Sequence, residues 1–117
     1  MAAAPPPATY FLGVLRYAVD IAIQAAGPIP DAAYAAVAGA LRPDDEALCV
    51  WIDEADRTRL LVSTDVSAVD VEAALASGRA LSAETLTLFD MDARVAEVIA
   101  ASEEELDQYS VWKPERR

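Results

Sequence analysis

The 117-residue chain contains no histidine and a single cysteine, Cys49. Histidine is the commonest general base near neutral pH and a frequent ligand of catalytic zinc, so its absence removes both roles. A single cysteine forms no intramolecular disulfide, builds no thiolate cluster for zinc or iron–sulfur, and has no histidine to activate it as a nucleophile. Because Cys49 stands between Leu48 and Val50 in an alternating apolar run, we expect a buried structural thiol.

Glycine is also scarce, with four residues that form no phosphate-binding run, so a nucleotide cofactor has no support in the sequence. The cluster Asp53, Glu54 and Asp56 lacks the further oxygen ligands and the bend glycine of a calcium loop. We expect these carboxylates to be solvated turn residues. The sequence therefore predicts no cofactor, no metal ion and no catalytic residues.

One segment does resemble a catalytic motif. Residues Thr85–Asp92, TLTLFDMD, look like the nucleophile motif of haloacid-dehalogenase-type phosphatases, in which a strand delivers two aspartates two residues apart. The resemblance implies Asp90 as nucleophile and Asp92 as proton-handling group. However, Ala93 replaces the glycine usual in the family, and Arg94 replaces its threonine-type residue. Only 25 residues follow Asp92, too few for the family's α/β core. Aspartates that cap a helix after a strand explain the pattern better, and the prediction remains that the protein is not an enzyme.

Charge is strongly one-sided, with 20 acidic and 9 basic residues and a formal charge of −11. This field repels nucleic-acid phosphates and anionic lipid surfaces, and it attracts basic protein surfaces. It is equally compatible with simple solubility. The lone cysteine and the lack of a basic segment before an apolar run argue against secretion and favour the cytoplasm. Tyr10–Ala26 is apolar but short, and it contains Arg16 and Asp20, so we expect no membrane contact.

The same segment, Tyr10–Ala26, predicts a first helix that ends at Gly27. Its polar positions Arg16, Asp20 and Gln24 are spaced by four and would form a narrow stripe on an otherwise apolar helix. Such a helix is either central to the core or covered by a second molecule. A second helix over Asp31–Leu41, rich in small residues, is expected to pair with it as a hairpin.

The middle of the chain changes to the period of strands. Leu48–Ile52 and the run around Leu60 and Val62 alternate and are joined by a polar stretch, which predicts an antiparallel β-hairpin. A short third helix is expected from Ser67 to Ser77, with Gly78 as its stop.

The segment Leu81–Phe89 is ambiguous between helix and strand, and its threonines and large apolar residues favour a strand. A last helix is expected from Asp92 onward, because Val95, Val98 and Ile99 recur at i, i+3 and i+4.

Together these segments predict an α+β fold with a small antiparallel sheet of about three strands packed against an N-terminal helical hairpin and further helices. Residues 1–8 are interpreted as a flexible Ala/Pro leader, 9–112 as a single domain and 113–117 as a charged tail.

The function favoured by this sequence is a non-catalytic protein-binding domain. The leading hypothesis is an acidic immunity or inhibitor protein that caps a basic partner such as a toxin. The alternative is an accessory or structural subunit that stabilises a larger enzyme or self-associates through Tyr10–Ala26. The predicted partner-binding residues are acidic or aromatic, and whether they converge on one face is left open by the sequence: Asp44, Asp45, Glu46, Trp51, Asp53, Glu54, Asp56, Glu103, Glu104, Tyr109 and Trp112.

Overall fold

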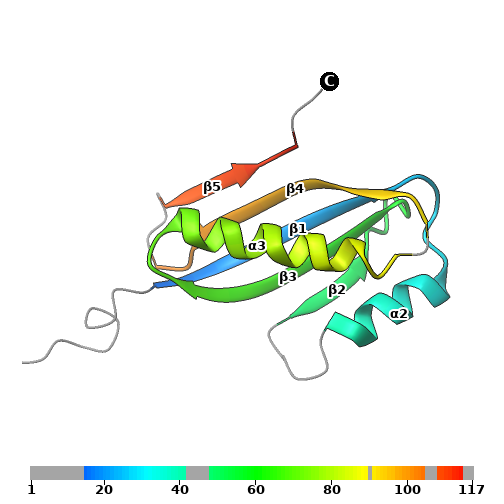
Figure 1. The fold of residues 1–117 in the computed structure, drawn as a ribbon, viewed down its shortest axis with the longest axis horizontal. Helices are drawn as coiled ribbons and strands as arrows, with labels where there is room; N and C mark the ends of the chain where they lie inside the picture. The colour runs from blue at the N-terminus through cyan, green and yellow to red at the C-terminus, as the bar shows by residue number, and fades with distance from the viewer. Residues whose placement is uncertain (1–14, 42–47, 90, 105–107, 115–117) are drawn as a thin grey trace, which may run out of the picture.

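A computed structural model describes residues 15–41, 48–89, 91–104 and 108–114 of the chain (Figure 1). Its elements follow one another in the order β1, α2, β2, β3, α3, β4 and β5. Their bounds are Leu15–Ala25 for β1, Asp31–Leu41 for α2, Cys49–Ile52 for β2, Arg59–Ala68 for β3, Val71–Leu86 for α3, Ala93–Ser102 for β4 and Tyr109–Trp112 for β5. Neither of the two described helices is long and apolar enough to span a bilayer.

The five strands form one antiparallel sheet in the order β2-β3-β1-β4-β5. Helix α2 connects β1 to β2, and β3 lies between these two strands in the sheet. Helix α3 connects β3 to β4, and β1 lies between those two strands. This double split βαβ arrangement is the ferredoxin-like strand order, and β5 extends it at the β4 edge.

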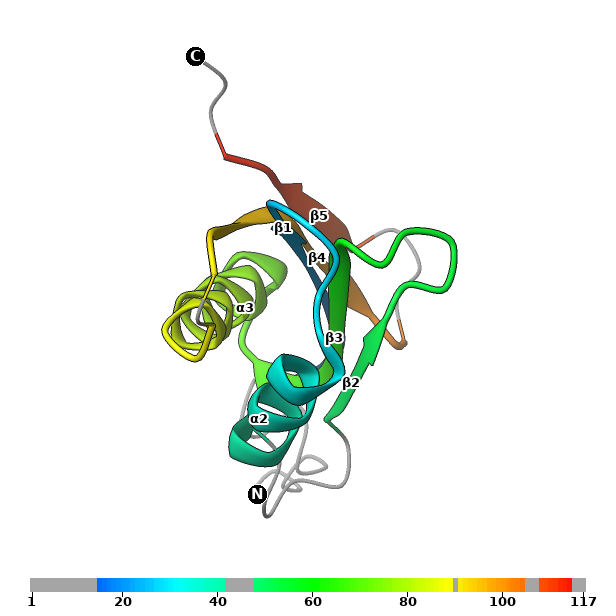
Figure 2. The same cartoon turned by 90° about the vertical axis from the view of Figure 1, so that its right-hand side faces the viewer.

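Both helices lie on the same side of the sheet, as Figure 2 shows. Alternation along the strands sends one set of side chains under these helices, and the core is made of that set together with apolar helix residues. The largest fully buried members are Tyr17, Ile21, Ile23, Ile29 and Leu60. Helix α3 crosses β1 and β4 and presents small residues to them, while α2 covers the β2 side through buried Val37. Within the described residues, no helix lies on the opposite face of the sheet.

The predicted N-terminal helical hairpin is wrong, because the first segment is the central strand β1. It pairs with β3 on one side and β4 on the other. The strand buries Tyr17, Val19, Ile21 and Ile23 under the helices, and its other face alternates polar residues with alanines, so the polar residues fall four apart as they would on a helix. The residues 10–14 of the predicted helix lie outside the described part of the chain.

The second half of the chain also differs from expectation. The predicted short helix from Ser67 is replaced by a longer β3 and by α3, which Asp70 caps by accepting a hydrogen bond from the Ala73 amide at 2.8 Å. Gly78 lies inside α3 and does not end it. The predicted strand over Leu81–Phe89 is helical up to Leu86, and the predicted last helix is strand β4. Five strands and two helices therefore replace the predicted three strands and additional helices.

Two elements are confirmed. Helix α2 begins at Asp31 and ends at Leu41 as predicted. The β2–β3 hairpin pairs Cys49–Ile52 with Leu60–Ser63 in antiparallel register.

Candidate protein-contact surfaces

The helix-free face of the sheet, here called the open face, is defined by the strand register. Trp51 lies opposite Leu61, and Ile99 lies opposite both Asp20 and Val111. Residues directly opposite in antiparallel strands project to the same side of the sheet. The side chains of the open face are Cys49, Trp51, Arg59, Leu61, Ser63, Asp65, Ser67, Arg16, Ala18, Asp20, Ala22, Gln24, Arg94, Glu97, Ile99, Ala101, Tyr109 and Val111.

Large apolar side chains are exposed on this face. Among described residues, four large hydrophobic side chains are exposed, and three of them are here: Trp51 at 43%, Val111 at 40% and Tyr109 at 60%. The fourth, Val69, lies between β3 and α3. A hollow of about 270 Å³ adjoins Trp51, lined also by Leu61 and Ile99 with charged groups around them. Clustered apolar exposure on one face is typical of a contact surface.

Charged groups border the apolar centre, and several are paired. Arg16 bonds Asp65 at 3.1 Å, and Lys113 lies 3.8 Å from Glu97. A hydrogen bond with Asp65 raises the pKa of Glu103, which lies at the same end of the sheet. The open face itself thus mixes both signs of charge, although the whole chain is strongly acidic.

The structure separates the predicted aromatic anchors. Trp51 and Tyr109 share the open face but lie on β2 and β5, the two edge strands, with three strands between them. Trp112 lies on the other face, where the guanidinium carbon of Arg79 on α3 is 4.5 Å from the ring centroid. The three aromatic residues therefore do not form one patch.

The predicted acidic groups are also separated. Asp53, Glu54 and Asp56 lie in the β2–β3 turn, whereas Glu103 and Glu104 follow β4 at the opposite end of the sheet. The strands between these ends are about 30 Å long. The third group, Asp44, Asp45 and Glu46, lies outside the described residues.

Two carboxylates of the β2–β3 turn have a structural role. Asp53 accepts a hydrogen bond from the Ala55 amide at 2.9 Å, and Asp56 accepts from the Thr58 amide at 3.0 Å and the Thr58 hydroxyl at 2.5 Å. These hydrogen bonds lower the pKa of Asp56. In the part of the chain that the structure describes, no three acidic or cysteine side chains gather as metal ligands.

Cys49 and the aspartate motif take positions that differ from those predicted. The predicted strand contains Cys49, but the thiol is exposed on the open face, so the expectation of a buried thiol is wrong. Asp92 directly precedes β4, and Asp90 lies outside the described residues. The strand that would deliver these aspartates in a phosphatase is a helix up to Leu86.

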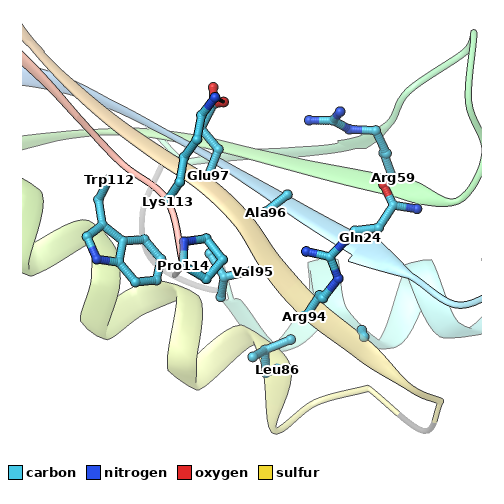
Figure 3. A pocket seen from close by; sticks show the side chains of 11 residues that line it. Gln24, Arg59, Leu86, Arg94, Val95, Ala96, Glu97, Trp112, Lys113 and Pro114 are labelled. Carbon is cyan, nitrogen blue, oxygen red and sulfur yellow. Dashed lines mark ion pairs between the residues drawn. The ribbon is translucent and has the colours of Figure 1, made fainter. Parts of the chain in front are cut away.

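A second surface feature is a groove of about 800 Å³ along the outer edge of β4, here called the β4 groove (Figure 3). Its residues come from four strands, the end of α3 and the segment after β5: Gln24, Arg59, Leu86, Ala93, Arg94, Val95, Ala96, Glu97, Trp112, Lys113 and Pro114. Figure 3 shows Arg59 and Glu97 on one side of the β4 ribbon and Leu86 on the other. Sequence reasoning missed the basic residues of this groove, because their proximity depends on a strand register that no local pattern reveals.

Comparison with protein-family models, curated proteins and solved structures finds no match for this chain.

Proposed function

We propose that this chain is a non-catalytic protein-binding domain that contacts its partner through the open face. The observation that supports the proposal is the placement of three of the four exposed large hydrophobic side chains, Trp51, Tyr109 and Val111, on the one face that no helix covers. Exposed aromatic residues commonly anchor protein interfaces, and a border of charged residues gives such interfaces their specificity.

The preferred partner is a basic protein, and the specific form of the proposal is an immunity or inhibitor protein acting in the cytoplasm on a partner such as a toxin. Acidic groups lie at both ends of the open face, in the β2–β3 turn and at Glu103 and Glu104. A basic surface that spans the sheet would meet apolar groups in the middle and carboxylates at each end. The formal charge of −11 would also accelerate its association.

An accessory or structural subunit is the second candidate, favoured by the exposed apolar groups themselves. The predicted first helix that motivated it, apolar except for one narrow polar stripe, is strand β1 in the structure. Self-association through the open face would instead use Ala18 and Ala22 of β1, together with Trp51 and Val111. Light scattering distinguishes a self-associating subunit from a monomer that binds only a foreign partner.

The test compares two matched variants during native purification. Trp51→Ser with Val111→Ser removes two exposed apolar side chains of the open face, one on each edge strand, whereas Val69→Ser removes an exposed valine elsewhere. The expected result is that the double variant loses the co-purifying partner while Val69→Ser retains it, both with the circular dichroism of the parent. Dissociation of the complex by salt would support a basic partner. Equal retention by both variants would overturn the open-face proposal.

A further inference from the structure

The first half of β4 has an unpaired outer edge. Strand β5 pairs only with Val98–Ala101, and among the described residues no strand pairs with Ala93–Glu97 on that side. The pairing ends where it does because Pro114 follows β5 and has no amide hydrogen to donate. Unpaired edge groups form a template for another extended segment.

A β-bulge arranges the side chains along this edge. Ala22 pairs with Glu97 and Ile23 with Val95, so Ala96 has no partner on β1. The bulge interrupts the alternation, and Arg94 and Glu97 consequently both lie on the open face. Val95 lies on the helix side with Leu86 and Trp112. The two sides of the edge therefore differ, one being charged and the other apolar.

The charged side of the groove has an excess of arginine. Glu97 is paired with Lys113, but neither Arg59 nor Arg94 has a carboxylate within ion-pair distance in the described part of the chain. The Nε atom of Arg59 is the single buried side-chain polar atom there without a hydrogen-bond partner. Orphan buried donors are rare in folded proteins, so the hydrogen-bonding capacity of Arg59 is incompletely used by the described residues. These two arginines favour an anionic ligand group locally, although the net charge of the chain, −11, opposes one at long range.

We propose that the β4 groove binds an extended peptide segment of a partner protein, in which acidic and apolar residues alternate. The segment adds as a strand beside Ala93–Glu97. Successive side chains of an added strand point to opposite faces, so acidic side chains lie toward Arg94, and toward Arg59 further in, while apolar side chains lie against Leu86, Val95 and Trp112. This site shares Arg59 and Arg94 with the open face, but it goes beyond the proposed open-face contact because it requires neither Trp51 nor Val111.

The test uses Trp112 as a reporter, because it lines the groove and is the only tryptophan left in a Trp51→Phe variant. The probe is a capped peptide of roughly eight residues with alternating Glu and Val, long enough to span the free edge. We expect saturable change in Trp112 fluorescence and slower exchange of amide hydrogens at Ala93–Glu97. A peptide of the same composition with its Glu and Val residues in two blocks should bind much more weakly.

Two charge-reversal variants identify the basic residues that matter. Arg94→Glu should weaken peptide binding by about tenfold or more, as expected when a charge-assisted hydrogen bond is lost. Arg57→Glu makes the same charge change at an exposed arginine outside the groove and should leave binding unchanged. Equal binding of the block peptide or of free glutamate, no effect of Arg94→Glu, or no saturable binding at all would each overturn the proposal. None of these results decides the open-face proposal, which is tested separately with Trp51→Ser and Val111→Ser.

Discussion

The guanidinium carbon of Arg79 lies 4.5 Å from the centroid of the Trp112 ring. This contact joins the middle of α3 to the last strand of the sheet, a strand of only four residues that pairs with β4 alone. A short edge strand has few hydrogen bonds of its own, so side-chain contacts to the layer above it contribute much of its local stability. Trp112 also closes one end of the β4 groove, and the contact therefore helps to define where that groove begins.

Arg79→Ala should lower the free energy of unfolding by about 0.5–1 kcal/mol, the usual strength of an accessible cation–π contact. The loss should be concentrated in β5, where amide hydrogen exchange would become faster. Urea denaturation measures the global effect. In a Trp112→Leu background the same arginine change should have almost no further effect, because its partner is absent. An equal loss in both backgrounds would mean that the two side chains are not coupled.

Gly78→Ala should destabilise the protein even though alanine favours helix. A Cβ atom at Gly78 would lie 2.7 Å from a methyl carbon of Val19 and 2.7 Å from one of Val98, so α3 would have to move away from β1 and β4. Overpacking of this kind typically costs about 1–3 kcal/mol, more than the roughly 1 kcal/mol that alanine adds to an exposed helix site. The measurement is the midpoint of urea denaturation, compared between proteins whose free energy of unfolding falls with urea at the same slope.

Gly39→Ala is the matched control for this prediction. Gly39 lies in α2, and a Cβ atom there has no neighbour within 4 Å. The substitution should therefore stabilise the protein by about 0.5–1 kcal/mol through helix propensity alone. The two glycine substitutions should thus shift the midpoint in opposite directions, and a stabilising Gly78→Ala would contradict the close packing of α3 on the sheet.

The elements that were predicted correctly are those whose signals are local. Helix α2 is bounded by Pro30 and Pro43, and the β2–β3 hairpin alternates on both sides of a polar turn. Strand β1 was misassigned because its polar residues Arg16, Asp20 and Gln24 are spaced by four. An interval of four keeps residues on one face of a strand as well as on one side of a helix. Only the tertiary structure decides between the two.

Strand β4 shows a different reason for failure. The spacing of Val95, Val98 and Ile99 matches a helix, but the bulge at Ala96 shifts the alternation so that Val95 and Val98 both face the helices. A bulge therefore imitates a helical period in the sequence. The same shift places Arg94 on the open face beside Gln24, which explains why the sequence did not reveal the basic groove. Of the three aromatic residues predicted to bind a partner, Trp51 and Tyr109 are exposed and Trp112 packs against Arg79, and their role in binding stays a prediction.

The second half of helix α3, beyond Ser77, was assigned wrongly because its buried side is made of small and polar residues. Ala74, Gly78, Ser82 and Thr85 recur at helical spacing but do not form an apolar stripe. The hydroxyls of Ser82 and Thr85 donate to the carbonyls of Arg79 and Leu81 at 2.7 and 2.8 Å, which satisfies them within the helix. The threonines of Leu81–Phe89 therefore predicted a strand. In the structure, Ser82 and Thr85 are small enough to let the helix approach the sheet closely.

Asp56 provides a prediction of pH dependence. Hydrogen bonds from the hydroxyl and amide of Thr58 lower its pKa below the ordinary value of 3.8, because they stabilise the carboxylate in the folded state. A carboxylate whose pKa is lowered by folding stabilises the folded protein. This stabilisation is fully present above the pKa of the unfolded state and is lost as the pH falls through the pKa of the folded state. Asp56→Ala should therefore destabilise the protein at neutral pH and have a smaller effect below about pH 3.

The check is urea denaturation of parent, Asp56→Ala and Glu54→Ala over this pH range. Glu54 lies in the same turn and carries the same charge, but the described residues give its carboxylate no hydrogen bond, so its substitution should have a small effect. The pH dependence of stability that comes from Glu103 has the opposite sign, because the hydrogen bond with Asp65 raises the pKa of Glu103. Its contribution to stability therefore falls as the pH rises. Because the parent and both variants contain Glu103, its contribution cancels when their free energies of unfolding are compared at the same pH. An Asp56→Ala effect that stays constant with pH would show that the Thr58 hydrogen bonds do not depend on the charge of Asp56.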